Sequence, residues 1–148
     1  MSGLSLNKHV QLAEATAPRQ VDRPLVMIVD DHDDTREMLR YAIEMNGYRV
    51  VEAADGEQAV RLAEGSLPNL ILMDTSLPEV DGYMATQRIR QLQGASRLTI
   101  IFLSGHAEPQ SREMALAAGG DGYFVKPVRL EELELALKKH LTPSYSRI

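Results

Sequence analysis

Five short apolar segments, each followed by a stretch with helical periodicity, constrain the fold more than any other feature of this sequence. The first covers residues 25–29, a run that indicates a strand buried on both faces. The others cover residues 48–52, 69–73, 98–103 and 123–125. Strands that alternate with helices form right-handed βαβ units, which place helices on both faces of a parallel sheet. The sequence therefore predicts an α/β fold built on one parallel sheet.

A helix is predicted after each strand, from apolar residues that recur with the helical period. In the first helix, Asn46 and Gly47 form a pair that tolerates positive φ and so marks the C-terminal end. In the second, Asp55 is expected to cap the helix, and Gln58 occupies the capping-box position. The five predicted helices cover residues 33–46, 56–64, 82–93, 110–118 and 129–141.

One domain is expected over residues 25–142. Residues 1–24 differ from the rest, because they are mostly polar and carry two prolines near their end. We expect a flexible extension there. The alternative is a short helix, with Leu6, Val10 and Ala13 on one side, that docks on a partner or on the domain itself. Residues 143–148 are expected to form a short C-terminal tail.

The composition argues against several classes of function. The sequence has no cysteine, which excludes a disulfide scaffold, thiol catalysis and zinc–thiolate sites. Its net charge of −5 provides no broad basic surface for phosphate neutralisation, so no nucleic-acid binding is expected. Its apolar runs are far too short to cross a bilayer, and its N-terminus has no apolar signal segment. We therefore expect a cytoplasmic protein without membrane contact.

Polar side chains stand where four of the predicted strands end. Asp30 and Asp31 follow the first strand, Asp74 follows the third, Ser104 the fourth and Lys126 the fifth. In an open parallel sheet the carboxyl ends of the strands lie on one edge, and ligands bind there where the strand order reverses. We therefore expect the carboxylates, the hydroxyl and the ammonium to share one crevice.

This set of side chains suggests a metal-assisted chemistry. Crowded carboxylates repel each other, and a hard divalent cation relieves the repulsion. A few oxygen ligands on a loop suit Mg²⁺, which keeps several waters and is usually completed by a phosphate oxygen. Asp74 then becomes a candidate nucleophile, because a carboxylate can accept a phosphoryl group as an acyl phosphate. Mg²⁺ and Lys126 would neutralise the charge on the transferring group, and Ser104 would hydrogen-bond one of its oxygens.

Each feature has a simpler interpretation when it is taken alone. The acidic residues after the first strand suit the start of a helix. An aspartate after a strand and the Ser104-Gly105 pair are both typical of turns, and Lys126-Pro127 is a common end to a strand. His32 lies in the acidic loop and could contact the site, but we expect His32 and His106 to lie mainly in solvent. The coincidence of these features at successive strand ends favours the functional interpretation.

At these positions the sequence resembles the receiver domain of bacterial two-component response regulators, of the single-domain type found in chemotaxis. The resemblance covers about residues 24–142 and depends on the order and spacing of short motifs. It implies a flavodoxin-like three-layer sandwich with five helices and the strand order 2-1-3-4-5. The matching motifs are Val29-Asp30-Asp31, Asp74 with Pro78 and Gly82 after it, Ser104-Gly105, and Tyr123-Phe124-Val125-Lys126-Pro127.

The functional residues of the family carry over position by position. The resemblance implies that Asp74 is phosphorylated, that Lys126 binds the phosphoryl group, and that the bond from Lys126 to Pro127 is cis. It also implies a Mg²⁺ site whose protein ligands are Asp30, Asp31, Asp74 and the backbone carbonyl of Ser76.

Two further positions match the residues that change conformation in the family. Ser104 resembles the switch hydroxyl and Tyr123 the switch aromatic. An aromatic residue on a short strand is also typical of simple packing, so both interpretations of Tyr123 stay open. Gly120 departs from the family pattern, which often has alanine there, and is expected to add flexibility without touching the chemistry.

The resemblance implies a signalling phosphoacceptor, which catalyses its own phosphotransfer and dephosphorylation and is otherwise no enzyme. A sensor histidine kinase or a histidine phosphotransfer protein would supply the phosphoryl group to Asp74. The modification adds roughly −1.5 to −2 charges. It would bias a two-state equilibrium of the face formed by the fourth helix, the fifth strand and the fifth helix, where a downstream protein binds.

Two alternatives stay open. The run from Asp31 to Thr35 also resembles the D-x-D-x-T motif of haloacid-dehalogenase-like phosphohydrolases, with Asp31 as the nucleophile and Asp33 as the general acid. Such enzymes need a further acidic pair after the lysine, and this interpretation leaves Asp74 unexplained. The other alternative is a receiver fold that serves as a passive interaction module. The intact acidic set argues against it, because unused carboxylates at a buried edge are costly.

Overall fold

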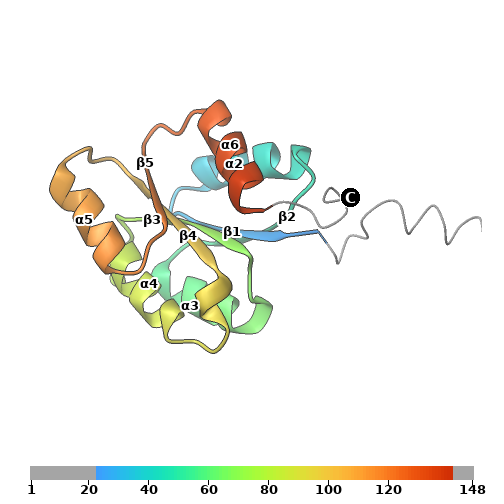
Figure 1. Cartoon of the computed structure of the whole chain (residues 1–148). Helices are drawn as coiled ribbons and strands as arrows, with labels where there is room; N and C mark the ends of the chain where they lie inside the picture. Colours follow the sequence, from blue (N-terminus) through green and yellow to red (C-terminus); the bar gives the residue numbers. More distant parts are fainter. Residues whose placement is uncertain (1–22, 142–148) are drawn as a thin grey trace, which may run out of the picture.

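The computed structural model describes residues 23–141. The predicted extension and tail therefore lie almost entirely outside the described residues. A parallel sheet runs through the middle of the structure (Figure 1), with its five strands in the order β2-β1-β3-β4-β5. The predicted fold class and strand order are confirmed. The strands are β1 (Leu25–Val29), β2 (Arg49–Ala53), β3 (Leu70–Asp74), β4 (Thr99–Ser104) and β5 (Gly122–Val125).

Helices cover both faces of the sheet and complete the predicted three layers. Above the sheet in Figure 1 lie α2 (Asp33–Met45) and α6 (Leu130–His140). The other face is covered by α3 (Gly56–Ser66), α4 (Gly82–Arg90) and α5 (Pro109–Ala117). The first two of these lie below the sheet in the same view.

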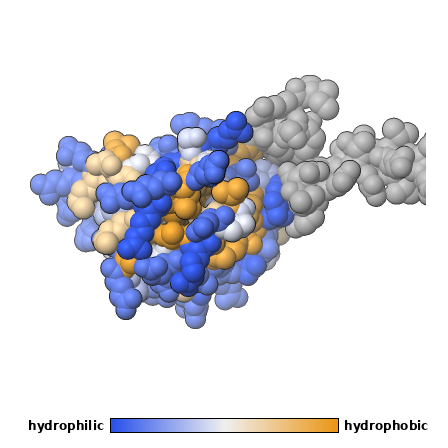
Figure 2. Space-filling model, turned by 90° about the horizontal axis from the view of Figure 1, so that it is seen from below, coloured by the Kyte–Doolittle hydropathy of each residue, from blue (hydrophilic) through white to orange (hydrophobic). Residues whose placement is uncertain are grey.

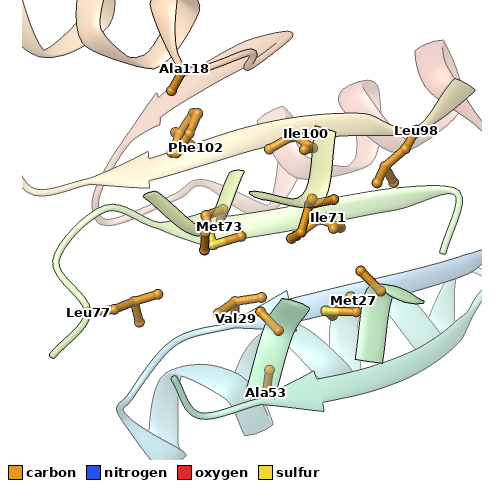
Figure 3. Close-up of a cluster of buried hydrophobic side chains, with 14 of the residues drawn as sticks. Met27, Val29, Ala53, Ile71, Met73, Leu77, Leu98, Ile100, Phe102 and Ala118 are labelled. Carbon is orange, nitrogen blue, oxygen red and sulfur yellow. The ribbon is translucent and has the colours of Figure 1, made fainter. Parts of the chain in front are cut away.

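Alternate side chains of the central strands divide the core into two clusters. Met27 and Val29 point to the face covered by α3, α4 and α5, and Figure 3 shows them beside Ile71 and Met73 of β3. The residues between them, such as Ile28, pack on the other face against α2 and α6. Because both faces of the sheet are covered there, the central strands β1, β3 and β4 are buried and apolar at nearly every position. This explains why short continuous runs predicted them correctly.

Most element boundaries differ from the predictions by one or two residues, and three of the differences have a clear structural reason. Asp74 and Ser104 are the last residues of β3 and β4 and do not follow them, because their backbones still pair with Leu103 and Val125 of the neighbouring strands. The helix predicted over residues 82–93 ends at Arg90, and a short 3₁₀ helix, η2 (Ala95–Arg97), follows.

Arg90 explains this early end. Its guanidinium donates to the backbone carbonyls of Ala95 and Leu98 at 2.7 and 2.6 Å, and it also forms an ion pair with Asp121. The chain therefore folds back around an arginine side chain, with Gly94 at a φ of +86°. The predicted cap of α3 is confirmed, since Asp55 Oδ1 accepts from the Gln58 amide at 2.7 Å.

The surface below the sheet combines polar and apolar side chains. Figure 2 shows this face, with apolar residues exposed between hydrophilic ones. Among the described residues, no helix has the length and apolar character needed to span a membrane.

Gly120 has a packing role that the sequence did not reveal. A Cβ at this position would lie 2.6 Å from the ring of Phe102 and 2.9 Å from the carbonyl oxygen of Ala115. Phe102 is fully buried in β4. The glycine therefore makes room for a large aromatic ring in the core, which is a more specific reason than flexibility.

We predict that Gly120→Ala lowers the free energy of unfolding by about 1–3 kcal/mol, because overpacking forces the core to shift. Gly65→Ala is the matched control. Gly65 is exposed in α3 with nothing near its missing Cβ, so this change is expected to stabilise by about 0.5 kcal/mol. Urea denaturation of both variants measures the difference. Equal effects of the two substitutions would contradict the packing role of Gly120.

Candidate functional site

The carboxyl edge of the sheet brings the predicted polar residues together. Lys126 follows β5, and its ammonium reaches across the edge to two other strands. Its Nζ lies 2.9 Å from Oδ2 of Asp30, which follows β1, and 3.2 Å from Oδ1 of Asp74, which ends β3. The bond from Lys126 to Pro127 is cis, as predicted, and the amide of Lys126 donates to the carbonyl of Ser104 at 2.7 Å, which positions the lysine.

Four side chains surround one small volume beside this lysine. Asp30, Asp31, His32 and Asp74 each offer one possible ligand atom, and these atoms all lie within 4.8 Å of one another. Asp30 and Asp74 are buried, whereas Asp31 and His32 are exposed. The predicted convergence of three carboxylates is therefore present, with an imidazole added to it.

The oxygens of the three carboxylates differ in how many donors they already meet. Both carboxylate oxygens of Asp30 accept hydrogen bonds. Oδ1 accepts from the amide and the ring of His32, and Oδ2 accepts from Lys126. In Asp74, the amide of Ser76 and the ammonium of Lys126 both lie 3.2 Å from Oδ1. Among the described residues, no hydrogen-bond donor reaches Asp74 Oδ2. A cation or an incoming electrophile therefore finds open oxygens on Asp74 and on the more exposed Asp31.

Burial and charge shift the ionisation of this cluster. Burial raises the pKa of Asp74, and the nearby charge of Asp30 raises it further. The hydrogen bond from Ser76 and the ammonium of Lys126 oppose that rise without cancelling it. For Lys126, burial lowers the pKa, but the two carboxylates outweigh this and leave it raised. The site thus keeps its lysine charged and holds Asp74 as a carboxylate that binds protons or cations more readily than usual.

Two further residues contact the acidic pair: His32, which is solvated as expected and also takes the alternative role of touching the site, and Arg36, which the sequence did not predict. The ring of His32 is 71% exposed, yet its Nδ1 lies 3.1 Å from both Asp30 and Asp31. Arg36 donates from Nη1 to the backbone carbonyl of Asp30 at 2.7 Å. Neither contact has a sequence signal beyond proximity to the acidic pair, because each depends on how the loop after β1 turns.

The close approach of α4 to β3 explains why residue 82, eight positions after Asp74, is a glycine. A Cβ on Gly82 would lie 2.2 Å from the carbonyl oxygen of Asp74 and 3.0 Å from the Cα of Thr75. Only a residue without a side chain lets the start of α4 pack directly on the backbone of Asp74.

The two predicted switch residues meet at one loop. Ser104 is fully buried, and its Oγ accepts from the amide of His106 at 3.1 Å. The hydroxyl of Tyr123 donates to the carbonyl of His106. The Tyr123 ring is half-buried against the core, and the guanidinium of Arg112 lies 5.3 Å from its centroid. Tyr123 therefore combines ordinary packing with a hydrogen bond to the loop that Ser104 also contacts.

Similar proteins place this geometry in a family. A family model described as response regulator receiver domain matches residues 26–138. An uncharacterised 14.6 kDa protein of Leptolyngbya boryana is 37% identical over 110 residues, which cover 74% of this chain and 82% of that protein. The transcriptional regulatory protein PhoP for alkaline phosphatase synthesis in Bacillus subtilis is 33% identical over 80% of this chain. The match spans 49% of PhoP, and it likewise spans about half of several other transcriptional regulators.

Solved structures agree with the sequence matches. The chemotaxis protein CheY4 of Vibrio cholerae superimposes with a TM-score of 0.77 at 28% identity, over 80% of this chain and 99% of CheY4. The receiver domain of a sensor histidine kinase from Pseudomonas aeruginosa has a TM-score of 0.74 at 37% identity, over 80% of this chain and 97% of its own. That structure holds a magnesium ion in its active-site cleft. With the family model, the fold and the acidic cleft in agreement, the chain belongs to the response regulator receiver domains of two-component signalling.

Proposed function

We propose that this chain is a single-domain response regulator that accepts a phosphoryl group from phosphohistidine on Asp74 and signals through protein contacts that depend on phosphorylation. The observation that carries the proposal is the Lys126 ammonium between Asp30 and Asp74, beside the exposed Asp31. A relative of 14.6 kDa, most of which this chain matches, supports function as a single domain.

The proposed step transfers the phosphoryl group from a nitrogen of phosphohistidine to a carboxylate oxygen of Asp74. Asp74 Oδ2 attacks the phosphorus of a phosphoimidazole, and the bond between phosphorus and nitrogen breaks. The electron pair stays on the departing imidazole nitrogen, and an acyl phosphate forms on Asp74. Lys126 is held beside Oδ1, where its charge stabilises the negative oxygens of the transferring group. Ser104 is placed at the end of the neighbouring strand to hydrogen-bond one of those oxygens in the product.

The residues present fit a Mg²⁺ ion. Asp31 and Asp74 each have a carboxylate oxygen that is open to a cation. The backbone carbonyl of Ser76 belongs to the turn that the Ser76 amide forms with the Asp74 carboxylate. Asp30 has both oxygens engaged by His32 and Lys126, so it suits a contact through water. When bound there, Mg²⁺ would offset the charge of the carboxylates and of the transferring phosphoryl group.

We propose that phosphorylation changes the conformation of the loop that Ser104 and Tyr123 contact. A shift of Ser104 toward the phosphoryl group would break its contact with the amide of His106, and the loop that holds the Tyr123 hydroxyl would then move. Tyr123 also lines a groove between β5 and α6, together with Phe124 and the exposed Leu135. These contacts support the α5–β5–α6 face as the surface that binds a downstream protein.

The phosphohistidine donor is proposed to be a sensor histidine kinase or a histidine phosphotransfer protein. Met38, Tyr41 and Met45 are exposed on one face of α2, which begins directly after the acidic loop. An apolar stripe beside a charged cleft suits a protein donor better than a small molecule. Because such donors obtain phosphate from ATP, we propose that the exchange takes place in the cytoplasm.

The two alternatives receive less support. In the phosphohydrolase interpretation Asp33 would act as the general acid beside Asp31. Asp33 is 89% exposed, pairs with Arg36, and is not part of the acidic cluster. A passive module would have no use for Lys126 and Asp74, which are held together at a buried edge.

We predict that acetyl phosphate with Mg²⁺ labels Asp74, because its Oδ2 is the open oxygen of the buried pair. Peptide mapping by mass spectrometry locates the label, and Asp74→Asn is expected to abolish it. Asp33→Asn is the matched control and is expected to keep the label. A label on Asp31 would establish the phosphohydrolase alternative, and an unlabelled protein would establish the passive module.

We further predict that Asp74→Asn stabilises the protein in a chelator at pH 7. The pKa of Asp74 is raised, so its contribution to stability is present at low pH and is lost as the pH rises through that pKa. Removal of the buried charge is therefore expected to increase the free energy of unfolding at pH 7. The gain should shrink as the pH falls toward 4 or so, the usual value for aspartate, because wild-type Asp74 becomes protonated there.

Thermal unfolding at several pH values, with chelator or with excess Mg²⁺, measures this effect. Mg²⁺ is expected to stabilise the wild type more than Asp74→Asn, since a ligand of the folded state at free concentration L stabilises by RT ln(1 + L/Kd) and the variant lacks one ligand carboxylate. A less stable Asp74→Asn protein in chelator at pH 7 would show that the ion pair with Lys126 outweighs the cost of burial.

A further inference from the structure

The guanidinium of Arg36 ties the acidic loop to two other elements. The Arg36 side chain is 14% exposed and uses three nitrogens. Nη1 donates to the carbonyl of Asp30 at 2.7 Å, Nε pairs with Glu52 of β2 at 3.1 Å, and Nη2 pairs with Asp33 at the start of α2. None of these contacts takes part in the proposed transfer of the phosphoryl group.

The carbonyl that Arg36 holds has a special place in the loop. It belongs to the peptide unit that joins Asp30 to Asp31, and a peptide unit is planar and rotates as one piece. On one side of it, the amide of Asp30 donates to Ala53 of β2 at 3.1 Å. On the other, the amide of His32 donates to the carboxylate of Asp30 at 2.8 Å. Fixing this peptide plane therefore restricts the backbone between the two acidic residues, from which both side chains project.

We propose that Arg36 is a positioning residue for the divalent cation, acting on the site through the peptide between Asp30 and Asp31. This inference rests on the proposed function, because it assumes that the acidic cluster binds Mg²⁺. Without the guanidinium, the acidic loop samples other orientations. Binding of Mg²⁺ then also has to order the loop, which makes the binding free energy less favourable. Groups that orient metal ligands in this way affect metal affinity strongly.

Electrostatics alone predicts the opposite effect. Arg36 is a cation near a cation site, so its removal by itself would strengthen the binding of a divalent ion. The ion pairs with Glu52 and Asp33 offset that repulsion in the native protein. The sign of the change in affinity thus separates a positioning role from an effect of charge.

Arg40 provides a matched control. It lies one turn further along α2 and pairs with the same Glu52, and also with Glu44. It is 44% exposed, and none of its contacts with the described residues involves the acidic loop. Arg36→Met and Arg40→Met therefore remove the same charge and a Glu52 ion pair, but only Arg36→Met frees the carbonyl of Asp30.

The experiment titrates the full-length chain with MgCl₂ by isothermal calorimetry at fixed pH and follows the amide resonances of the acidic loop by NMR. We expect Arg36→Met to weaken Mg²⁺ binding about tenfold and to broaden or shift the amide resonances of Asp31 and His32. Arg40→Met is expected to leave the dissociation constant within about twofold, because exposed ion pairs contribute little. Excess Mg²⁺ should restore the labelling of Asp74 in Arg36→Met.

An unchanged or tighter dissociation constant in folded Arg36→Met would overturn the proposal. If Arg36→Met does not fold, Arg36→Lys replaces it. This variant keeps the charge and can pair with Glu52, but it cannot serve three acceptors at once. Weaker binding by Arg36→Lys supports the positioning role, and wild-type affinity refutes it. Wild-type protein that binds no Mg²⁺ would refute the proposed metal site, a result distinct from failure of the Arg36 inference alone.

Discussion

The ammonium of Lys126 is the interaction on which the site depends. Two buried carboxylates at adjoining strand ends repel each other, and burial makes their charge costly. Lys126 reaches both of them from a third strand, and its own pKa is raised because they outweigh its burial. The compensation is incomplete, since the pKa of Asp74 also stays raised. The folded protein thus keeps a carboxylate whose charge is only partly compensated, and the proposed binding of a cation or formation of an acyl phosphate would compensate it further.

The parallel sheet makes this arrangement possible. Parallel strands end on the same edge, so residues far apart in the sequence meet without any long connection between them. Lys126 and Asp30 are 96 positions apart and form a 2.9 Å contact. Helices on both faces of the sheet bury the strands and leave this edge for polar groups. The apolar residues that stabilise the fold are therefore separate from the polar residues that form the site.

The sequence predicted the site residues that stand at strand ends. It was a poor guide to the contacts that depend on loop conformation. Asp30, Asp31, Asp74, Ser104 and Lys126 were identified because each stands where an apolar run stops. The contact of Arg36 was missed and that of His32 was only the less favoured alternative, since both depend on the turn after β1, for which no periodic pattern exists. The early end of α4 was missed for a related reason. The helical pattern continues past Arg90, but the carbonyls that its guanidinium binds come from the folded chain that follows.

The position of Asp74 within β3 has a stereochemical consequence. Its backbone is fixed by pairing with β4 on one side and by the start of α4 at Gly82 on the other, so the carboxylate can change direction only by rotating its short side chain. In the proposed transfer, in-line displacement at phosphorus would then restrict the direction from which a donor can approach. Because the proposed acceptor can adjust so little, each donor has to bring its phosphoryl group to Asp74 in the matching orientation. Selection among donors therefore falls to the surfaces around the cleft, which can diverge between paralogues while the reacting atoms keep the same trajectory.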